Sequence, residues 1–336
     1  MACRCSAIPC CCAAPREPRR RASRTWWISP LPSASGSFRP SSSCSGAASR
    51  RSRRCRRPCW SVPGRRKGVS VAAPIPPILL VGCGRMGGAM LAGWRERGLA
   101  PSFAVDPAPP VVPEGIGHAV EPGAVPAGFA PAAVVLAVKP QNAAATLPAY
   151  RRYAGSAVFL SIMAGRTSAG MRALLGEDAA IVRAMPNTPA AVRQGITVAY
   201  AGPGVTTEQR RLCDTLLAAI GLVAWVEEEA LLDAVTAVSG SGPAYVFLLA
   251  ELMERAAVEQ GLPPDLARLL ARRTVSGSGA LLEASGEDAA ALRRGVTSPG
   301  GTTERALAVL MEPGAWPALL SRAIADAAAR SRELAG

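Results

Sequence analysis

Short apolar runs alternate with amphipathic stretches between about residues 74 and 227. The runs are three to five residues long and rich in Val, Ile, Leu and Ala, as in strands buried within a parallel sheet. Stretches 86–98 and 206–220 repeat apolar residues at helical spacing. Strands that alternate with helices predict an α/β domain with a Rossmann-type, doubly wound, mostly parallel sheet. The predicted strands are 78–81, 103–105, 134–138, 158–162, 181–184, 196–200 and 222–226.

The pattern changes after Glu227, where strand signals end and long helical stretches begin. We therefore expect an all-helical domain over 228–336, a Rossmann-type domain over 74–227 and a disordered basic extension over 1–73. The Ala- and Leu-rich helices are too apolar for one small domain to bury, so we expect the last domain to dimerise. The predicted helices are 231–260, 265–284, 288–293, 303–311 and 316–334.

The net charge of +14 is confined to the N-terminal extension. Residues 1–67 hold sixteen Lys or Arg and one acid, whereas the remainder holds twenty-two basic and twenty-three acidic residues. A balanced body argues against nucleic acid or a membrane surface as its partner. We find no apolar run of about 18 residues and expect no spanning helix. The extension is interpreted as a disordered segment, a transit peptide or the product of a mis-assigned start.

Cysteine follows the same division, because eight of the ten lie in the first 59 residues. Only Cys83 and Cys213 remain, so we expect no disulfide framework and a cytoplasmic protein. His118 is the only histidine, and its Gly- and Pro-rich surroundings predict a loop. No cluster of ligand residues has zinc spacing, so no metal site is expected.

A glycine motif, Gly82-Cys83-Gly84-Arg85-Met86-Gly87, follows the first predicted strand and opens a helix. The first glycine permits a tight turn, the second lets a pyrophosphate approach the backbone, and the third allows close helix–strand packing. Asp106 ends the second predicted strand, 22 residues after Gly84. An acid there accepts hydrogen bonds from ribose hydroxyls, which favours NADH over NADPH, but a turn-forming Asp is an equally good interpretation.

Three further motifs follow in order. Ala137-Val138-Lys139-Pro140 ends the third predicted strand, where ligands of open α/β sheets bind. In Met185-Pro186-Asn187-Thr188-Pro189, the Asn187 side chain could donate to a nicotinamide carboxamide or cap the next segment, and we favour the cap. In Ser239-Gly240-Ser241-Gly242-Pro243-Ala244-Tyr245, small residues favour close helix packing.

The segment Ser298-Pro299-Gly300-Gly301-Thr302-Thr303 precedes a predicted helix. Free backbone N–H groups and hydroxyls at a helix start form a cradle suited to a carboxylate, although an ordinary capping loop is the plainer alternative. Two glycines and two threonines exceed what a cap requires, so we favour the cradle.

With these motifs in this order, residues 76–334 resemble the Δ1-pyrroline-5-carboxylate reductases. The resemblance implies reduction of the cyclic imine 1-pyrroline-5-carboxylate to L-proline with NADPH or NADH, and a homodimer or higher homo-oligomer. Relatives often have a Ser or Arg near the second strand end, so Asp106 departs from that pattern. The implied cofactor residues, with Asp106 from the spacing above, are Gly82, Cys83, Gly84, Arg85, Met86, Gly87, Asp106, Ala137, Val138, Lys139, Pro140, Met163 and Ala164; the implied substrate residues are Ser298, Gly301, Thr302 and Thr303.

Thr303 is the candidate catalytic residue, as hydrogen-bonding partner of the substrate nitrogen. The imine nitrogen carries a proton near neutral pH, so no strong general acid is needed. Three alternatives stay open: a reductase for another cyclic imine, a β-hydroxyacid dehydrogenase-like enzyme and a nucleic-acid binder that uses the basic extension. The β-hydroxyacid dehydrogenases share this two-domain plan but use a Lys in the helical domain. No Lys follows Lys139 in this chain, which argues against that alternative.

Overall fold

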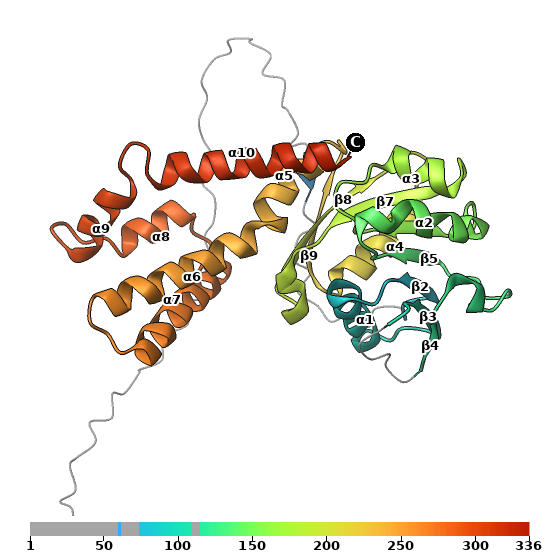
Figure 1. Cartoon of the computed structure of the whole chain (residues 1–336), viewed down its shortest axis with the longest axis horizontal. Helices are drawn as coiled ribbons and strands as arrows, with labels where there is room; N and C mark the ends of the chain where they lie inside the picture. The colour runs from blue at the N-terminus through green and yellow to red at the C-terminus, as the bar shows by residue number, and fades with distance from the viewer. Residues whose placement is uncertain (1–59, 62–73, 109–114, 336) are drawn as a thin grey trace, which may run out of the picture. The chain divides into compact units, whose positions relative to one another are not determined.

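The computed structural model describes residues 60–61, 74–108 and 115–335, which form one sheet and a series of helices (Figure 1). The strands are β1 (Trp60–Ser61), β2 (Ile78–Val81), β3 (Ser102–Val105), β4 (Ile116–Ala119), β5 (Ala133–Leu136), β6 (Val158–Ser161), β7 (Ala180–Met185), β8 (Gly195–Ala201) and β9 (Gly221–Val226). The α-helices are α1 (Arg85–Glu96), α2 (Ala143–Thr146), α3 (Ser168–Leu175), α4 (Thr207–Ala218), α5 (Leu231–Val235), α6 (Gly242–Glu259), α7 (Pro264–Ala284), α8 (Ala289–Gly295), α9 (Thr302–Leu310) and α10 (Trp316–Ala335). Shorter 3-10 helices cover Pro122–Ala124, Pro140–Asn142, Leu147–Tyr153 and Thr188–Val192, and a π-helix covers Thr236–Gly240.

The described strands form one mixed sheet in the order β1-β9-β8-β7-β6-β5-β2-β3-β4. Neighbours from β4 to β7 are parallel, as are β8 and β9, whereas β7–β8 and β1–β9 are antiparallel. The chain runs outward from β2 through β3 to β4, and from β5 through β6 to β7 in the other direction. The junction of β2 and β5 is therefore the switch point at which such sheets bind ligands. The predicted doubly wound, mostly parallel fold is confirmed.

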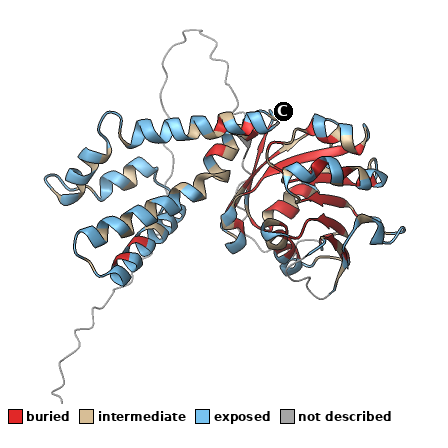
Figure 2. Ribbon diagram, viewed as in Figure 1, coloured by how far each residue is buried: buried red, intermediate tan, exposed pale blue. Residues whose placement is uncertain are grey.

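Two hydrophobic clusters cover the two faces of the sheet, because alternate residues of each strand point to opposite faces. Ile78 and Leu80 of β2 belong to one cluster, and Leu79 and Val81 belong to the other. The first cluster contains α1 and α4, where the fully buried Trp94 donates its indole N–H to the Leu216 carbonyl at 2.8 Å. Figure 2 shows these strands as the buried centre of the domain.

Two strands were not predicted. β4 pairs in parallel with β3, so His118 lies in a strand, and the expectation that it lies in a loop was wrong. The run Ile116-Gly117-His118-Ala119 has too few apolar residues to signal a strand, and Gly117 fits beside the ring of Phe103 because it has no side chain. Trp60 and Ser61 pair with Val226 and Trp225, within the segment predicted as a disordered extension. The rest of that extension lies outside the described residues.

After β9 the described chain forms only helices, and α6 to α10 expose most of their surface in Figure 2. Exposed apolar side chains lie on α6, α7 and α10, including Phe247, Leu269 and Leu320. By length and composition alone, the helical stretch Leu231–Glu259 could cross a membrane, and 11% of its most apolar 18-residue window is buried. The boundaries at residues 73 and 227 remain predictions.

Candidate active site

The glycine motif forms a tight loop between β2 and α1, and its three glycines have different surroundings. Gly82 has a φ of 91°, and a Cβ there would lie 2.7 Å from the Ala137 carbonyl oxygen. A Cβ on Gly87 would collide with the carbonyl oxygen of Gly82. A Cβ on Gly84 would meet nothing within 4 Å. The first and third glycines are thus needed for packing, whereas the second faces open space, as a pyrophosphate requires.

The N-terminus of α1, the positive end of the helix dipole, lies at the end of this loop. Its N-cap residue is Gly84, no side chain caps the helix, and its first turn holds no acidic residue. The first backbone N–H groups of a helix have no partner within the helix, and the helix dipole favours an anion beside them. The loop therefore fits the phosphates of a dinucleotide.

Asp106 lies directly beside the glycine loop. Its Oδ2 accepts a hydrogen bond from the Cys83 N–H at 2.7 Å, and its Oδ1 accepts one from the Ala108 N–H at 2.9 Å. Both carboxylate oxygens therefore accept backbone hydrogen bonds, as the turn-forming interpretation of Asp106 requires. His118 Nε2 lies 2.9 Å from the Asp106 carbonyl oxygen. Burial, with the charge of Asp106, raises the pKa of the Cys83 thiol, so this thiol stays protonated at neutral pH.

The other two predicted cofactor segments lie at the carboxyl ends of the neighbouring strands β5 and β6. Ala137 donates its N–H to Val81 at 2.7 Å, which holds the first segment against the glycine loop. Arg166, two residues beyond Ala164, donates its Nε–H to the Pro140 carbonyl at 3.0 Å. The structure therefore brings Gly82–Gly87, Asp106, Ala137–Pro140 and Met163–Ala164 together at one edge of the sheet.

The predicted substrate segment lies between α8 and α9, with Gly301 as N-cap and Thr302 as the first residue of α9. Two of its amides are already engaged: Gly300 donates to Glu304 Oε2 at 2.7 Å, and Gly301 donates to the Ser298 carbonyl at 3.0 Å. The Gly301 N–H, which we expected to be free, is therefore taken within the loop.

Apart from the backbone bonds within α9, the hydrogen bonds of residues 296–303 go to neighbours between residues 293 and 305. Within the described single chain, they do not join the substrate segment to the cofactor loops.

Comparison with known proteins places these segments in a family. Residues 229–334 match a family model described as pyrroline-5-carboxylate reductase dimerisation. The chain is 39% identical over 279 residues to the pyrroline-5-carboxylate reductase of Pseudomonas aeruginosa, an alignment that covers 77% of this chain and 97% of that protein. The chain belongs to the pyrroline-5-carboxylate reductase family.

Solved structures of pyrroline-5-carboxylate reductases agree with this assignment. One from Coxiella burnetii, 31% identical, superposes with a TM-score of 0.70 over 78% of this chain and 99% of that one. One from Plasmodium falciparum, solved with NADP bound and 25% identical, has a TM-score of 0.68 over the same shares. The exposed apolar helices fall within the matched dimerisation region, so the family assignment accounts for their exposure in a single chain.

Two features near the site of this pyrroline-5-carboxylate reductase family member were not predicted from its sequence. Asn187 does not cap the following 3-10 helix with its side chain; instead its Oδ1 accepts from the Ile196 N–H at 3.0 Å, so the expected cap was wrong. Arg183, only 6% exposed, pairs with Glu229 from the segment after β9. The only sequence signal for this ion pair was an Arg within an apolar strand, and nothing in the sequence identified Glu229 as its partner.

Proposed function

We propose that this chain reduces 1-pyrroline-5-carboxylate to L-proline with NADPH or NADH, the last step of proline biosynthesis, as an oxidoreductase acting on a CH–NH group. The observation that carries the proposal is the coverage of almost the whole Pseudomonas aeruginosa reductase by a chain that retains both the glycine loop and Ser298–Thr303. A metal site is not needed for this chemistry, and among the described residues no cluster of three or more His, Cys, Asp or Glu side chains has suitable geometry.

The cofactor, when bound, supplies the hydride that reduces the imine carbon. The loop around Gly84 and the start of α1 hold its pyrophosphate, and Asp106 faces its adenosine ribose. Ala137–Pro140 and Met163–Ala164 line its path along the carboxyl edge of the sheet. These groups orient and bind, and their common position at one edge of the sheet supports this assignment.

The substrate contacts are assigned to the start of α9. Ser298 and the backbone N–H groups of Thr302 and Thr303 hold the carboxylate, with Gly301 contributing once its bond to Ser298 opens. The Thr303 hydroxyl accepts a hydrogen bond from the protonated ring nitrogen and fixes the imine plane. Because the substrate already carries this proton near neutral pH, the protein supplies orientation rather than a strong acid.

The cofactor preference is assigned to Asp106. A carboxylate at this position accepts from ribose hydroxyls and repels a 2′-phosphate, so the chain favours NADH over NADPH relative to family members with Ser or Arg there. The assembly is a homodimer or a higher homo-oligomer, and the protein acts in the cytoplasm, where thiols such as the unpaired Cys83 and Cys213 stay reduced.

The proposed function is tested by cofactor oxidation, followed at 340 nm, with pyrroline-5-carboxylate as substrate. Two analogues serve as controls: 1-pyrroline, which lacks the carboxylate, and a six-membered cyclic imine carboxylate. We expect kcat/KM to be highest for pyrroline-5-carboxylate and at least tenfold lower for 1-pyrroline, because the cradle loses its anion. Preference for the six-membered ring would establish the alternative, a reductase for another cyclic imine.

A further inference from the structure

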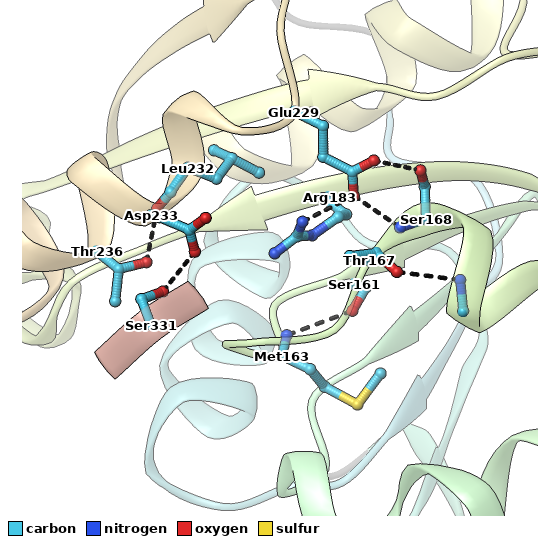
Figure 3. A network of polar contacts seen from close by, with 11 residues as sticks. Ser161, Met163, Thr167, Ser168, Arg183, Glu229, Leu232, Asp233, Thr236 and Ser331 are labelled. Carbon is cyan, nitrogen blue, oxygen red and sulfur yellow. Dashed lines mark hydrogen bonds and ion pairs between the residues drawn. The ribbon is translucent and has the colours of Figure 1, made fainter. Parts of the chain in front are cut away.

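Glu229, in the segment between β9 and α5, makes three hydrogen bonds with its two carboxylate oxygens (Figure 3). It accepts from the Ser168 N–H at 2.7 Å, from the Ser168 hydroxyl at 2.6 Å and from Nη1 of Arg183 at 2.7 Å. Ser168 is the first residue of α3, so the carboxylate also stands at the positive end of a helix. Glu229 therefore joins the start of the helical part to two elements of the sheet domain.

The two elements are α3 and β7, and both adjoin the loop 162–167 of the proposed cofactor site. Arg183 pairs in register with Ser161, the last residue of β6, and Ser161 Oγ accepts from the Met163 N–H at 3.3 Å. The loop 162–167 leaves β6 at this point and ends at α3, where Ser168 bonds to Glu229. The carboxylate of Glu229 thus acts on both ends of the loop that carries Met163 and Ala164.

The same loop is anchored at its middle. Gly165, with a φ of 64°, lies so close to α10 that a Cβ there would be 2.8 Å from the Cβ of Leu334. Ser331, on the same helix, donates its hydroxyl to Asp233 of α5 at 2.6 Å. The loop consequently lies against the helical part, while Arg166 joins it to the first cofactor segment.

The surroundings of Glu229 stabilise its ionised form. Burial raises its pKa, but the hydrogen bonds from Ser168 and Arg183 outweigh burial and hold the pKa below its usual value. The group is therefore a fixed carboxylate at neutral pH. Arg183 is buried in β7, so both partners are held in one geometry rather than moving in solvent.

We propose that Glu229 is a positioning residue for hydride transfer: through Ser168 and Arg183 it fixes the cofactor loop 162–167 against the helical part of the same chain. This inference rests on the proposed function for its kinetic consequence. Its structural part concerns only the order of the loop, which does not depend on which imine is reduced. Glu229 touches neither cofactor nor substrate in this assignment and acts through the loop.

The test uses Glu229→Asp, because this change keeps the charge that the buried Arg183 needs. The side chain becomes shorter by one methylene, about 1.5 Å, so the carboxylate cannot reach Ser168 and Arg183 together. The matched control is Glu96→Asp. Glu96 also faces an arginine, Arg193, at 2.7 Å, but it lies at the C-terminal end of α1, away from the glycine loop.

Two quantities are measured on the full chain: amide hydrogen exchange of the peptide covering 162–168, and the single-turnover rate of hydride transfer with saturating cofactor and pyrroline-5-carboxylate. For Glu229→Asp we expect exchange to rise roughly tenfold and hydride transfer to slow roughly tenfold or more, because small misplacement of reacting groups is costly in rate. Cofactor affinity should stay within about threefold. Glu96→Asp should leave both quantities within about twofold of wild type.

Unchanged exchange in 162–168, or raised exchange with an unchanged hydride-transfer rate, would overturn the positioning role. If wild type does not turn over pyrroline-5-carboxylate, the proposed function fails, while the exchange result still decides whether Glu229 orders the loop. If Glu229→Asp does not fold, Ser168→Ala replaces it. That variant loses one of the three bonds and should raise exchange about threefold, and no rise would contradict the inference.

Discussion

Asp106 and Cys83 are joined by a 2.7 Å hydrogen bond between the aspartate Oδ2 and the backbone N–H of the glycine loop. We therefore assign two effects to this carboxylate: it orders the loop that we assign to the pyrophosphate, and in our proposal it places a negative charge beside the adenosine ribose. A substitution that removes both effects at once would confuse loop order with cofactor choice.

Asp106→Asn separates them at the glycine loop, because its amide oxygen still accepts from the Cys83 N–H, while the charge and the bond from the Ala108 N–H are lost. We expect the ratio of kcat/KM for NADPH to that for NADH to rise about tenfold, since repulsion of the 2′-phosphate disappears. Steady-state kinetics with both cofactors provides the measurement. Asp106→Ser also loosens the loop, so it should in addition lower kcat/KM for NADPH and for NADH. An unchanged ratio in Asp106→Asn would mean that this carboxylate serves only as a turn residue.

Stability should depend on pH through Glu229. Its pKa is lower in the folded chain than its ordinary value of 4.5, so its contribution is complete above about pH 4.5 and is lost as pH falls through the folded pKa. Glu229→Gln leaves the buried Arg183 without a counter-charge and should cost about 3 kcal/mol at pH 7.

Urea unfolding of wild type and Glu229→Gln between pH 7 and pH 3.5 checks this. The difference in unfolding free energy should shrink below pH 4.5, because the unfolded wild-type carboxyl takes up a proton there, whereas the folded one becomes protonated only at lower pH. A difference that stays constant over this range would argue against the charge of Glu229 as its source. Glu96→Gln, at an exposed ion pair, should leave the unfolding free energy close to that of wild type at every pH.

The substrate segment should be completed by a second copy of the chain. The hydrogen bonds of residues 296–303 stay within their own neighbourhood, and the segment belongs to the region that matches the dimerisation model. We therefore expect Thr303 of one protomer to face the Gly84 loop of its partner.

Mixed dimers of Gly84→Val and Thr303→Ala provide the measurement. Each mixed dimer would contain one site with both defects and one intact site. Random pairing makes half of the dimers mixed, and half of the sites in a mixed dimer are intact. The activity of the mixture should therefore exceed the activity of the two separate variants by about a quarter of the wild-type activity. If both segments came from one chain, every site would carry a defect, and mixing would produce no gain.

The parts of the fold that local pattern determines were predictable from sequence. Buried strands such as Ile78–Val81, the glycine turn at Gly82 and the helix ending near Gly98 follow from residues close together in the chain. β4 was missed because its sequence lacks an apolar run, and its place depends on pairing with β3.

The site could be predicted in its backbone segments but not in its side-chain partners. Arg183 and Glu229 are 46 residues apart, and only the parallel pairing of β6 and β7 explains their relation to Met163. Similarly, Asn187 reaches Ile196 because the chain reverses between β7 and β8. Such pairs depend on tertiary structure and have no signature in local spacing.

The central claim is that the cofactor and the substrate bind to different segments, the Gly84 loop and the start of α9. Thr303→Ala removes one hydroxyl beside the substrate nitrogen, a bond worth about 1 kcal/mol and more to a charged iminium. Gly84→Val instead fills the space above the loop, which is open in this structure.

The most direct measurement determines, for both variants, the cofactor dissociation constant by fluorescence titration and kcat/KM for pyrroline-5-carboxylate. We predict that Thr303→Ala lowers kcat/KM for the imine about tenfold or more and keeps cofactor affinity within about twofold. Gly84→Val should abolish cofactor binding. Equal weakening of cofactor and substrate by Thr303→Ala, or unchanged turnover, would contradict the account and direct the search for the substrate cradle to the loop around Asn187.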